Sequence, residues 1–254
     1  MYRNPLKAKV LNREKITGCI IQGALPAFIE MTALAGFDFV FIDTEHTSFS
    51  IRDCEVLIRT AEARNTIPLI RIFDKSPQTI LHYMDIGAMG VIVPGVESGE
   101  EVKNVVNAVK YYPQGNRGLC PTTSAADFGM KATLKDYTKE ANNETVVFGI
   151  IESKQAVENI NDILSVEGLD GVLIGTTDLA QSLGCSGEYN HPEVNEMFEK
   201  VVQACLAKNI TIGAVIREGE IPKKYFDLGV NMVILNLYSL ISKELQRFIY
   251  AKEI

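Results

Sequence analysis

The sequence has no pair of cysteines spaced to form a metal-binding or redox motif. Its five cysteines are an odd number, spread along 254 residues, and no two of them form a CxxC pair. This argues against a zinc-finger or thiol–disulfide function and is what a reducing cytoplasm permits. We expect the cysteines to be small, buried, apolar side chains.

Long apolar segments are absent as well. No run approaches the roughly 18 residues that a membrane-spanning helix needs, and Met1 to Lys7 contains no apolar core of a secretory signal. The net charge of -7 argues against nucleic acid or an anionic membrane as the main partner. A local arginine can still bind an anionic small molecule. We therefore expect a soluble, cytoplasmic protein that acts on small molecules.

The sequence does contain a regular alternation of short apolar runs with longer segments of helical periodicity. Most runs are rich in valine and isoleucine without polar alternation, as expected for strands that are covered on both faces. Strands that alternate with helices indicate a parallel sheet. The predicted strands are 18–22, 37–43, 67–73, 90–96, 146–152, 171–175, 211–216 and 231–235.

Helices are predicted between these runs, and two of their starts carry clear signals. Ser76 precedes Pro77, and Ser98 precedes an acidic first turn, as N-cap residues commonly do. Residues 112–141 read as irregular, too long for a plain connection, and are expected to cover an active-site mouth or an oligomer contact. The predicted helices are 26–35, 51–64, 78–86, 100–111, 154–166, 193–207 and an amphipathic C-terminal helix, 240–252.

About eight strand–helix units fit within this length, which is near the typical size of a TIM barrel. An open doubly wound sheet is the alternative. The number of units, and the lack of a glycine-rich phosphate loop after the first strand, favour the closed barrel. We predict one (β/α)8 TIM-barrel domain over residues 1–254, with the C-terminal helix used in oligomer contacts.

Charged residues follow the predicted strands at the same end. Asp43 and His46 follow the second strand, Arg71 ends the third, and Glu152 and Asp178 follow the fifth and sixth. Active sites of such barrels form where strands end and βα loops begin. Charged groups directly after apolar runs are costly to desolvate unless they are paired or bind a metal. The pattern therefore predicts an active site at this end of the barrel.

The residue types suggest a chemistry. Glu152 and Asp178 are hard oxygen donors without a nearby Cys or second His, so they favour Mg, Mn or Co over a zinc–thiolate site. Such a metal could polarise the carbonyl of a 2-oxo acid and stabilise an enolate. Arg71 offers a guanidinium fork for a carboxylate or oxyanion. The His46 imidazole suits proton transfer near neutral pH, and Asp43 could orient it or pair with Arg71.

Each of these residues also fits a structural role when it is taken alone. Either carboxylate could form an ion pair, Asp43 and Arg71 could be a buried pair, and His46 could be a solvated loop residue. All of these roles would have to coincide at one end of one barrel, which favours a functional site. A Schiff base between Lys154 and the 2-oxo group is a second mechanism, but the sequence shows no apolar pocket to lower a lysine pKa.

At these same positions the sequence resembles the HpcH/HpaI class II pyruvate aldolases, in the branch that cleaves 4-hydroxy-2-oxoheptanedioate and 2-dehydro-3-deoxy sugar acids. The likeness extends from about residue 18 to 240. The matching motifs lie at 36–46, 68–71, 81–94, 112–118, 152–154 and 166–179.

The resemblance implies an activity and a role for each of five residues. The activity is reversible retro-aldol cleavage of a 4-hydroxy-2-oxo acid to pyruvate and an aldehyde, with Mg, Mn or Co as cofactor. Glu152 and Asp178 match the metal ligands, and Arg71 matches the pyruvate-binding arginine. His46 and Asp43 match the catalytic His–Asp pair.

The resemblance also implies roles for three further residues and a form of assembly. Asp85 matches a carboxylate that supports the site from a neighbouring loop or subunit. Thr176 and Thr177 stand in the segment before the metal Asp and are expected to contact the substrate. The family forms a homohexamer of paired barrels with exchanged C-terminal helices.

The sequence departs from the family pattern at four places. Ile150 replaces a Gln that touches pyruvate, and Thr44 replaces the Gly of a Gly-Glu-His turn. Gly175-Thr176-Thr177 replaces Gly-Pro-Ala, and Asn236 stands near a common Gly. These changes leave the predicted metal site and base in place and affect the choice of aldehyde.

Two other functions remain as alternatives. One is a lyase acting on a CoA thioester or a related 2-oxo diacid, which would need a basic groove for the nucleotide. The other is a non-catalytic metabolite-binding barrel, suggested by the missing Gln. The presence of all five site residues speaks against the second.

Overall fold

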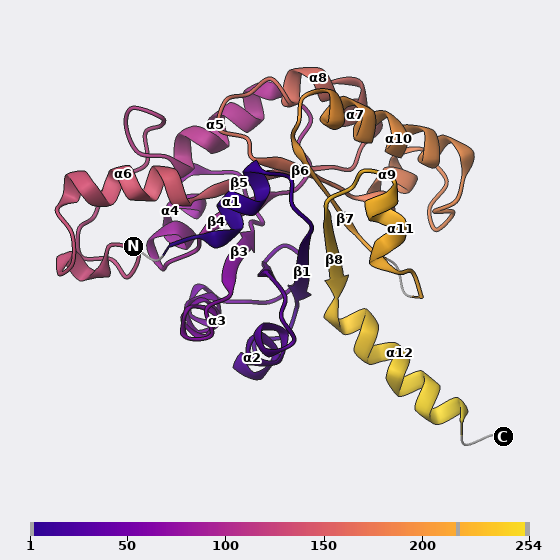
Figure 1. The fold of residues 1–254 in the computed structure, drawn as a ribbon, viewed down its shortest axis with the longest axis horizontal. Helices are drawn as coiled ribbons and strands as arrows, with labels where there is room; N and C mark the ends of the chain where they lie inside the picture. The colour runs from indigo at the N-terminus through magenta and orange to yellow at the C-terminus, as the bar shows by residue number, and fades with distance from the viewer. Residues whose placement is uncertain (1–2, 217–218, 252–254) are drawn as a thin grey trace.

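Eight parallel strands close into a barrel in chain order, with the first strand paired to both the second and the eighth (Figure 1). The structure, a computed structural model, describes residues 3–216 and 219–251. The predicted TIM barrel is confirmed, and every predicted strand is found to within three residues at each end. The strands are β1 Ile16–Ile21, β2 Phe39–Asp43, β3 Ile67–Arg71, β4 Gly90–Val93, β5 Val146–Ile151, β6 Gly171–Ile174, β7 Thr211–Val215 and β8 Met232–Asn236.

Helices surround the barrel (Figure 1). Both predicted caps are present, because the Ser76 and Ser98 hydroxyls accept hydrogen bonds from the backbone N–H groups of Thr79 and Glu101. The helices are α1 Pro5–Leu11, α2 Pro26–Leu34, α3 Ile51–Ala63, α4 Pro77–Asp85, α5 Gly99–Val109, η1 Asp127–Gly129, α6 Leu134–Glu144, α7 Lys154–Glu158, α8 Ile160–Ile163, α9 Thr176–Ser182, α10 Pro192–Ala207, α11 Pro222–Asp227 and α12 Leu237–Tyr250.

Two helical predictions need correction. The segment 154–166 is not one helix, since α7 ends at Glu158 and Asn159 turns out of it to donate a side-chain hydrogen bond to the Glu97 carbonyl. The segment 112–141 is not irregular throughout, because α6 begins at Leu134. The buried side of α6 is only Tyr137, Ala141 and Asn142, and most of its other residues are polar, so the segment lacks the apolar content by which the other helices are recognised in the sequence.

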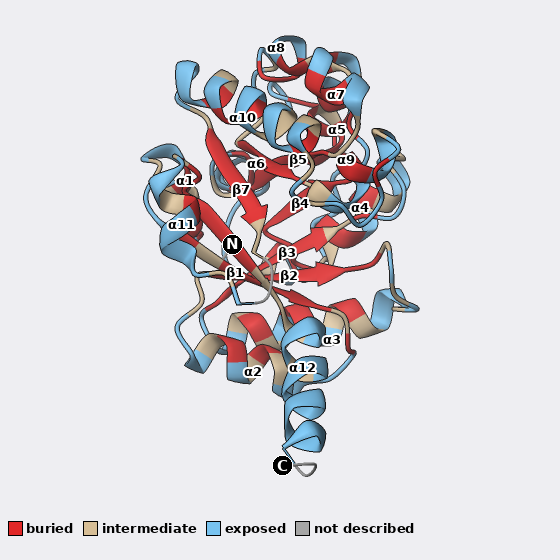
Figure 2. Ribbon diagram, turned by 90° about the vertical axis from the view of Figure 1, so that its right-hand side faces the viewer, coloured by how far each residue is buried: buried red, intermediate tan, exposed pale blue. Residues whose placement is uncertain are grey.

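The core has two layers, one inside the barrel and one between the sheet and the helices (Figure 2). Large side chains such as Phe39, Phe41 and Phe148 fill the interior, as eight strands leave room only for packed side chains. Leu6 and Val10 of α1 belong to this interior cluster and close its N-terminal end. Four of the five cysteines are buried as expected, but Cys120 is exposed, so that expectation is wrong for it.

The helix α12 extends away from the barrel and contacts it mainly through its first turn (Figure 1). It begins three residues earlier than predicted, and Lys252, the predicted end, lies outside the described residues. Its apolar residues Leu240, Leu245, Phe248 and Ile249 are exposed, and none of its residues is buried. Like every other helix in the described part of the chain, it is not suited by length and hydropathy to cross a membrane.

Candidate active site

Alternation along the strands brings polar side chains together at the C-terminal mouth of the barrel. Successive side chains of a strand point to opposite faces, so a residue two positions after an interior side chain also points inward. Five polar residues at or just past strand ends meet this condition. They are Gln22, Asp43, Arg71, Glu152 and Asn236, which follow the interior residues Ile20, Phe41, Leu69, Ile150 and Ile234.

Asp43 and Arg71 form a bidentate ion pair. They are register partners on β2 and β3, with Nε 2.9 Å from Oδ1 and Nη2 2.6 Å from Oδ2. The Asp43 side chain is fully buried, and the guanidinium lies 5.3 Å from the centre of the Phe41 ring. Burial raises the pKa of Asp43, but hydrogen bonds from Arg71 and its charge outweigh burial and hold that pKa below its usual value.

The loop after β2 wraps around Asp43. The backbone N–H groups of Glu45 and His46 donate to Oδ1 at 3.1 and 3.3 Å, and the Thr47 hydroxyl donates to the Asp43 carbonyl. Thr44, the residue found in place of the family glycine, donates its hydroxyl to the Arg71 carbonyl at 2.6 Å and ties this loop to β3.

His46 meets Asp43 through its backbone and not through its ring. Its Nε2 lies 3.5 Å from Glu45 Oε2, and the same oxygen lies 3.3 Å from Arg71 Nη1. The His46 side chain is 59% exposed, so it is open to the mouth. Of the two uses that the sequence leaves open for Asp43, the pairing with Arg71 is found, and Glu45 is the carboxylate beside the imidazole.

Glu152 carries the most perturbed carboxyl group at the mouth. Burial, together with the charges of Asp178 and Glu45, raises its pKa to about 7. The Gly95 N–H, 2.5 Å from Oε1, and the Arg71 charge act in the opposite direction. A Cβ on Gly175 would stand 2.8 Å from Oε2, so only glycine allows this close approach.

The donor set fits a divalent cation. Three carboxylates, Glu45, Glu152 and Asp178, interact around one guanidinium that Asp43 already neutralises, and such an excess of negative charge favours a bound cation. In residues 3–216 and 219–251 no group of three or more Asp, Glu, His or Cys side chains is arranged to hold a metal by itself. Glu152 and Asp178 would therefore leave several coordination positions to water and substrate.

Asp178 lies in the first turn of α9, together with Thr176 and Thr177. The N-cap of this helix is Gly175, which has no side chain to cap the first turn. Thr176 is half-buried, while Thr177 and Asp178 are exposed. The short link from β6 to α9 thus brings the predicted substrate-binding threonines and the predicted second ligand to the mouth.

Asp85 is not part of this assembly within the chain. It ends α4, which runs from the mouth back to the start of β4, so Asp85 lies toward the opposite end of the barrel. There its carboxylate binds Arg117 Nη2 at 2.6 Å, and its carbonyl accepts the Ala125 N–H. A role for Asp85 at the mouth would have to come from a second copy of the chain.

Gln22, Glu45 and Lys75 are site residues that the sequence interpretation missed. Gln22 had a usable signal, because it stands two residues after Ile20 in an apolar run, as Asp43 stands two after Phe41. Lys75 had none, since it lies in a loop. Its Nζ donates to the Gly95 carbonyl at 2.5 Å and pairs with Glu101 at 3.3 Å, which holds the loop whose N–H binds Glu152.

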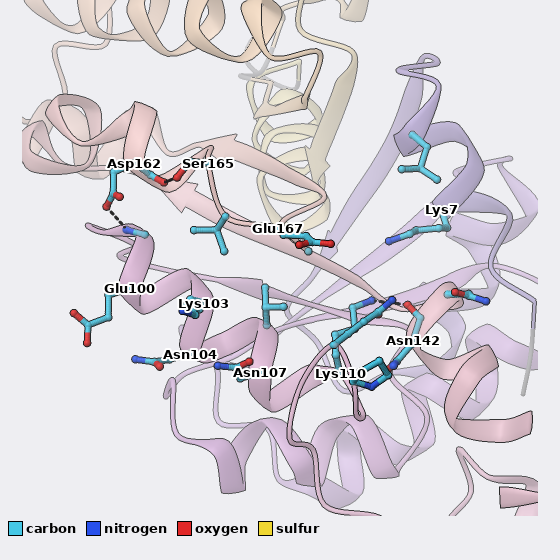
Figure 3. A pocket seen from close by; sticks show the side chains of 18 residues that line it. Lys7, Glu100, Lys103, Asn104, Asn107, Lys110, Asn142, Asp162, Ser165 and Glu167 are labelled. Atoms are coloured by element: carbon cyan, nitrogen blue, oxygen red, sulfur yellow. Dashed lines mark hydrogen bonds between the residues drawn. The ribbon is translucent and has the colours of Figure 1, made fainter. Parts of the chain in front are cut away.

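A polar pocket of about 1340 Å³ lies elsewhere, along α5 on the outside of the barrel (Figure 3). Its lining includes Lys103, Asn104 and Asn107, together with the buried Lys110. The Lys110 ammonium is fully engaged, because it donates to the Asn142 carbonyl and to the carbonyl and hydroxyl of Thr145. The pocket shares none of the polar groups of the mouth, so volume alone would misplace the active site.

Comparisons with known proteins identify the family of the chain. A family model described as HpcH/HpaI aldolase/citrate lyase matches residues 17–237. The chain is 31% identical to hydroxypyruvate/pyruvate aldolase of Cupriavidus necator over 91% of this chain and 85% of the relative. It is 30% identical to 2-keto-3-deoxy-L-rhamnonate aldolase of Klebsiella pneumoniae over 95% of this chain and 90% of that relative.

Solved structures extend the comparison to the whole fold. The citrate synthase SbnG is 32% identical, with a TM-score of 0.88 over 98% of this chain and 97% of that one. An HpcH/HpaI aldolase from Desulfitobacterium hafniense is 27% identical, with a TM-score of 0.91 over 98% and 96%. The chain belongs to the HpcH/HpaI aldolase/citrate lyase family and is a carbon–carbon lyase of that family.

Proposed function

We propose that the protein is a class II aldolase that cleaves 4-hydroxy-2-oxo acids reversibly to pyruvate and an aldehyde, with a divalent cation as cofactor. The observation that carries this proposal is the grouping of Glu152, Asp178 and Glu45 around Arg71 at the mouth of the barrel. A cation held by Glu152 and Asp178 would polarise the 2-oxo group of the substrate as a Lewis acid.

Arg71 binds the carboxylate of the 2-oxo acid. Asp43 occupies Nε and Nη2, which leaves Nη1 as the donor that faces the mouth, 3.3 Å from Glu45. A substrate carboxylate therefore takes the place of Glu45 on Nη1. The Asp43 pair keeps the guanidinium plane fixed while this exchange occurs, which lowers the cost of ordering it on binding.

His46 moves the proton of the 4-hydroxyl group. Its ring is exposed to the mouth, and Glu45 beside Nε2 can accept a hydrogen bond from the imidazole and orient it. General acid–base catalysis requires such a group within hydrogen-bond reach of the reacting hydroxyl. The backbone contact with Asp43 fixes the loop that carries the ring.

Ile150 makes the floor of the site apolar. It is buried in the barrel interior, two residues before Glu152, where the family has a Gln. Pyruvate binding then relies on Arg71 and the cation. Loss of one polar contact weakens binding by about 1 kcal/mol, so we expect a higher KM for pyruvate than a Gln variant would show.

A second candidate is the addition of pyruvate to a 2-oxo diacid in place of an aldehyde. The 32% identity to a protein named citrate synthase favours it. The aldol addition forms one carbon–carbon bond between the pyruvate methyl carbon and the acceptor carbonyl, and oxaloacetate would give a tricarboxylic 4-hydroxy-2-oxo acid. A CoA thioester fits less well, because Glu45, Glu152 and Asp178 make the mouth acidic where a nucleotide needs cations.

A panel of 4-hydroxy-2-oxo acids of different lengths, with pyruvate release followed by lactate dehydrogenase, tests the proposal. We expect release with Mg²⁺, Mn²⁺ or Co²⁺ and none from Glu152→Gln. Failure of every substrate with all three metals would refute the aldolase function. A product of pyruvate and oxaloacetate alone, identified by mass spectrometry, would favour the second candidate.

A further inference from the structure

A chain of hydrogen bonds runs beneath Arg71 from the first turn of α12. The Ser239 N–H donates to Asn236 Oδ1 at 3.0 Å, and Asn236 Nδ2 donates to Gln22 Oε1 at 3.2 Å. Gln22 Nε2 then donates to Asp43 Oδ2 at 3.0 Å, on the oxygen that also binds Arg71 Nη2. The chain joins β8 to β1 and β1 to β2, three neighbouring strands of the barrel (Figure 1).

The direction of this chain is determined by one backbone group. A backbone N–H can only donate, so the Asn236 side chain must present its oxygen to Ser239 and its NH₂ to Gln22. Gln22 must then accept with its oxygen and turn its own NH₂ toward Asp43. The ambiguity of amide orientation that affects isolated Asn and Gln side chains is removed here. Asp43 therefore always receives a donor from Gln22.

The packing of α12 holds Asn236, where the chain of hydrogen bonds begins. The Tyr238 hydroxyl stands 2.6 Å from the position of a Cβ on Gly23, so α12 lies against the end of β1 as closely as a glycine allows. The Tyr238 ring also packs edge-on against Phe28, with 6.3 Å between the ring centres. Asn236 is therefore set by the packing of α12, and not by contacts with the site.

We propose that Gln22 and Asn236 are positioning residues that orient Asp43 and, through it, the guanidinium of Arg71. The inference rests on the proposed function, in which Arg71 binds the substrate carboxylate. Asp43 accepts two hydrogen bonds from Arg71 and two from the backbone of its own loop. Gln22 supplies the remaining side-chain donor, on the side of Asp43 toward β1, so its loss lets the carboxylate and the bound guanidinium rotate together.

Two variants separate this role from a structural one. Gln22→Met keeps the length of the side chain and removes its hydrogen bonds. Asn236→Ser keeps an oxygen that can cap α12, but its side chain is too short to reach Gln22. Gln203→Met, on an exposed position of α10, is the matched control for the loss of a glutamine. Thermal melting of all three shows whether each variant is folded.

The first readout is kinetic. Loss of a hydrogen bond to a charged group should raise the KM for pyruvate in the addition direction about tenfold in both variants, with kcat within about threefold of the wild type. The KM of the double variant should be close to that of each single variant, because both changes interrupt the same chain of hydrogen bonds. An unchanged KM in Gln22→Met, or a lower kcat at an unchanged KM, would overturn the proposal. An unchanged KM for pyruvate in Asn236→Ser would show that Asn236 does not help to position Asp43.

The second readout does not require a substrate. The ¹H–¹⁵N signal of the Arg71 Nε–H, assigned by its disappearance in Arg71→Lys, should shift and exchange faster with water in both variants but not in Gln203→Met. An unchanged signal in Gln22→Met would refute the positioning role even if the protein had no aldolase activity. If the signal changed in both variants but the wild-type protein released no pyruvate, the positioning role would stand and only the proposed function would be refuted.

Discussion

Asp43 and Arg71 are directly opposite each other on adjacent parallel strands, and each oxygen of the carboxylate binds a different nitrogen of the guanidinium. The pair is buried on the Asp43 side and open on the Arg71 side, where the arginine side chain keeps 13% of its surface exposed. A fork anchored at one edge and accessible at the other is suited to hold a second carboxylate.

Substitution of Arg71 should impair binding and catalysis together. Arg71→Lys should reduce both pyruvate release and the exchange of pyruvate methyl protons with solvent by about 10²-fold, since an ammonium cannot present the fork. Steady-state kinetics and proton exchange measured by NMR test this.

Arg71→Ala needs a control of its own. It leaves the Asp43 charge buried without a partner, which costs about 3–5 kcal/mol. The double variant Arg71→Ala with Asp43→Asn removes that charge, so it should melt higher than Arg71→Ala and remain equally inactive. Recovery of activity in the double variant would contradict a role for Arg71 in binding the substrate.

Substitution of His46 should affect turnover and leave binding in place. His46→Ala should reduce kcat by roughly 10²–10⁴, the usual effect of losing a general acid–base, while the KM for pyruvate changes little. Steady-state kinetics of pyruvate release test this. Near-normal turnover would mean that His46 is a solvated loop residue and that another group moves the proton.

Removal of metal should abolish activity without unfolding the barrel. EDTA should stop pyruvate release and added Mg²⁺, Mn²⁺ or Co²⁺ should restore it. Titration with Mn²⁺, followed by electron paramagnetic resonance, should give one site in the wild type and about 10²-fold weaker binding in Glu152→Gln and Asp178→Asn. A pyruvate adduct trapped on Lys154 by borohydride would instead indicate the Schiff-base mechanism.

Lys110 should contribute a stability that increases with pH above pH 8. Burial lowers the pKa of Lys110 from 10.5 to about 8. Between these values the unfolded chain keeps the proton and the folded chain releases it, so the free energy of unfolding increases with pH. The contribution is at most about 1.4 kcal/mol per pH unit. Burial raises the pKa of Cys19, Cys54 and Cys205, which lowers stability above pH 9 in every variant. The free energy of unfolding of the wild type minus that of Lys110→Met, from urea unfolding at pH 7.5, 9 and 10, should therefore increase with pH; an unchanged difference would contradict the prediction.

The protein should form oligomers through α12. Phe248, 79% exposed, and the neighbouring Leu245 and Ile249 form an apolar face that the barrel of the same chain does not cover. Light scattering should give a mass that is a multiple of 28.1 kDa. Phe248→Asp should dissociate the assembly, while Gln246→Asp, which adds the same charge on the same helix, should not. A wild-type mass of one chain would refute this prediction.

The sequence alone predicts the barrel because each strand is marked by a pattern of residues within a short stretch of the chain. Runs such as 146–151 contain no polar side chain, which is typical of a strand covered on both faces, and the serine caps before α4 and α5 locate the helix starts. The positions of Arg71 and Glu152 at strand ends follow from the same pattern. The helix α6 was not predicted, because only one narrow side of it is buried and its sequence is mostly polar.

Contacts between distant residues were decided only by the tertiary structure. The sequence leaves open whether Asp43 orients His46 or pairs with Arg71. The register of β2 and β3 puts Arg71 opposite the carboxylate and leaves Glu45 beside the imidazole. Gln22 and Asn236 meet across 214 positions because the barrel closes between β1 and β8. Asp85 lies away from the mouth because α4 runs opposite to its strands. The residue types and the ends of the strands can be read from short stretches of sequence. Which residues contact each other depends on the register of the strands and on the closure of the barrel, and only the tertiary structure determines these.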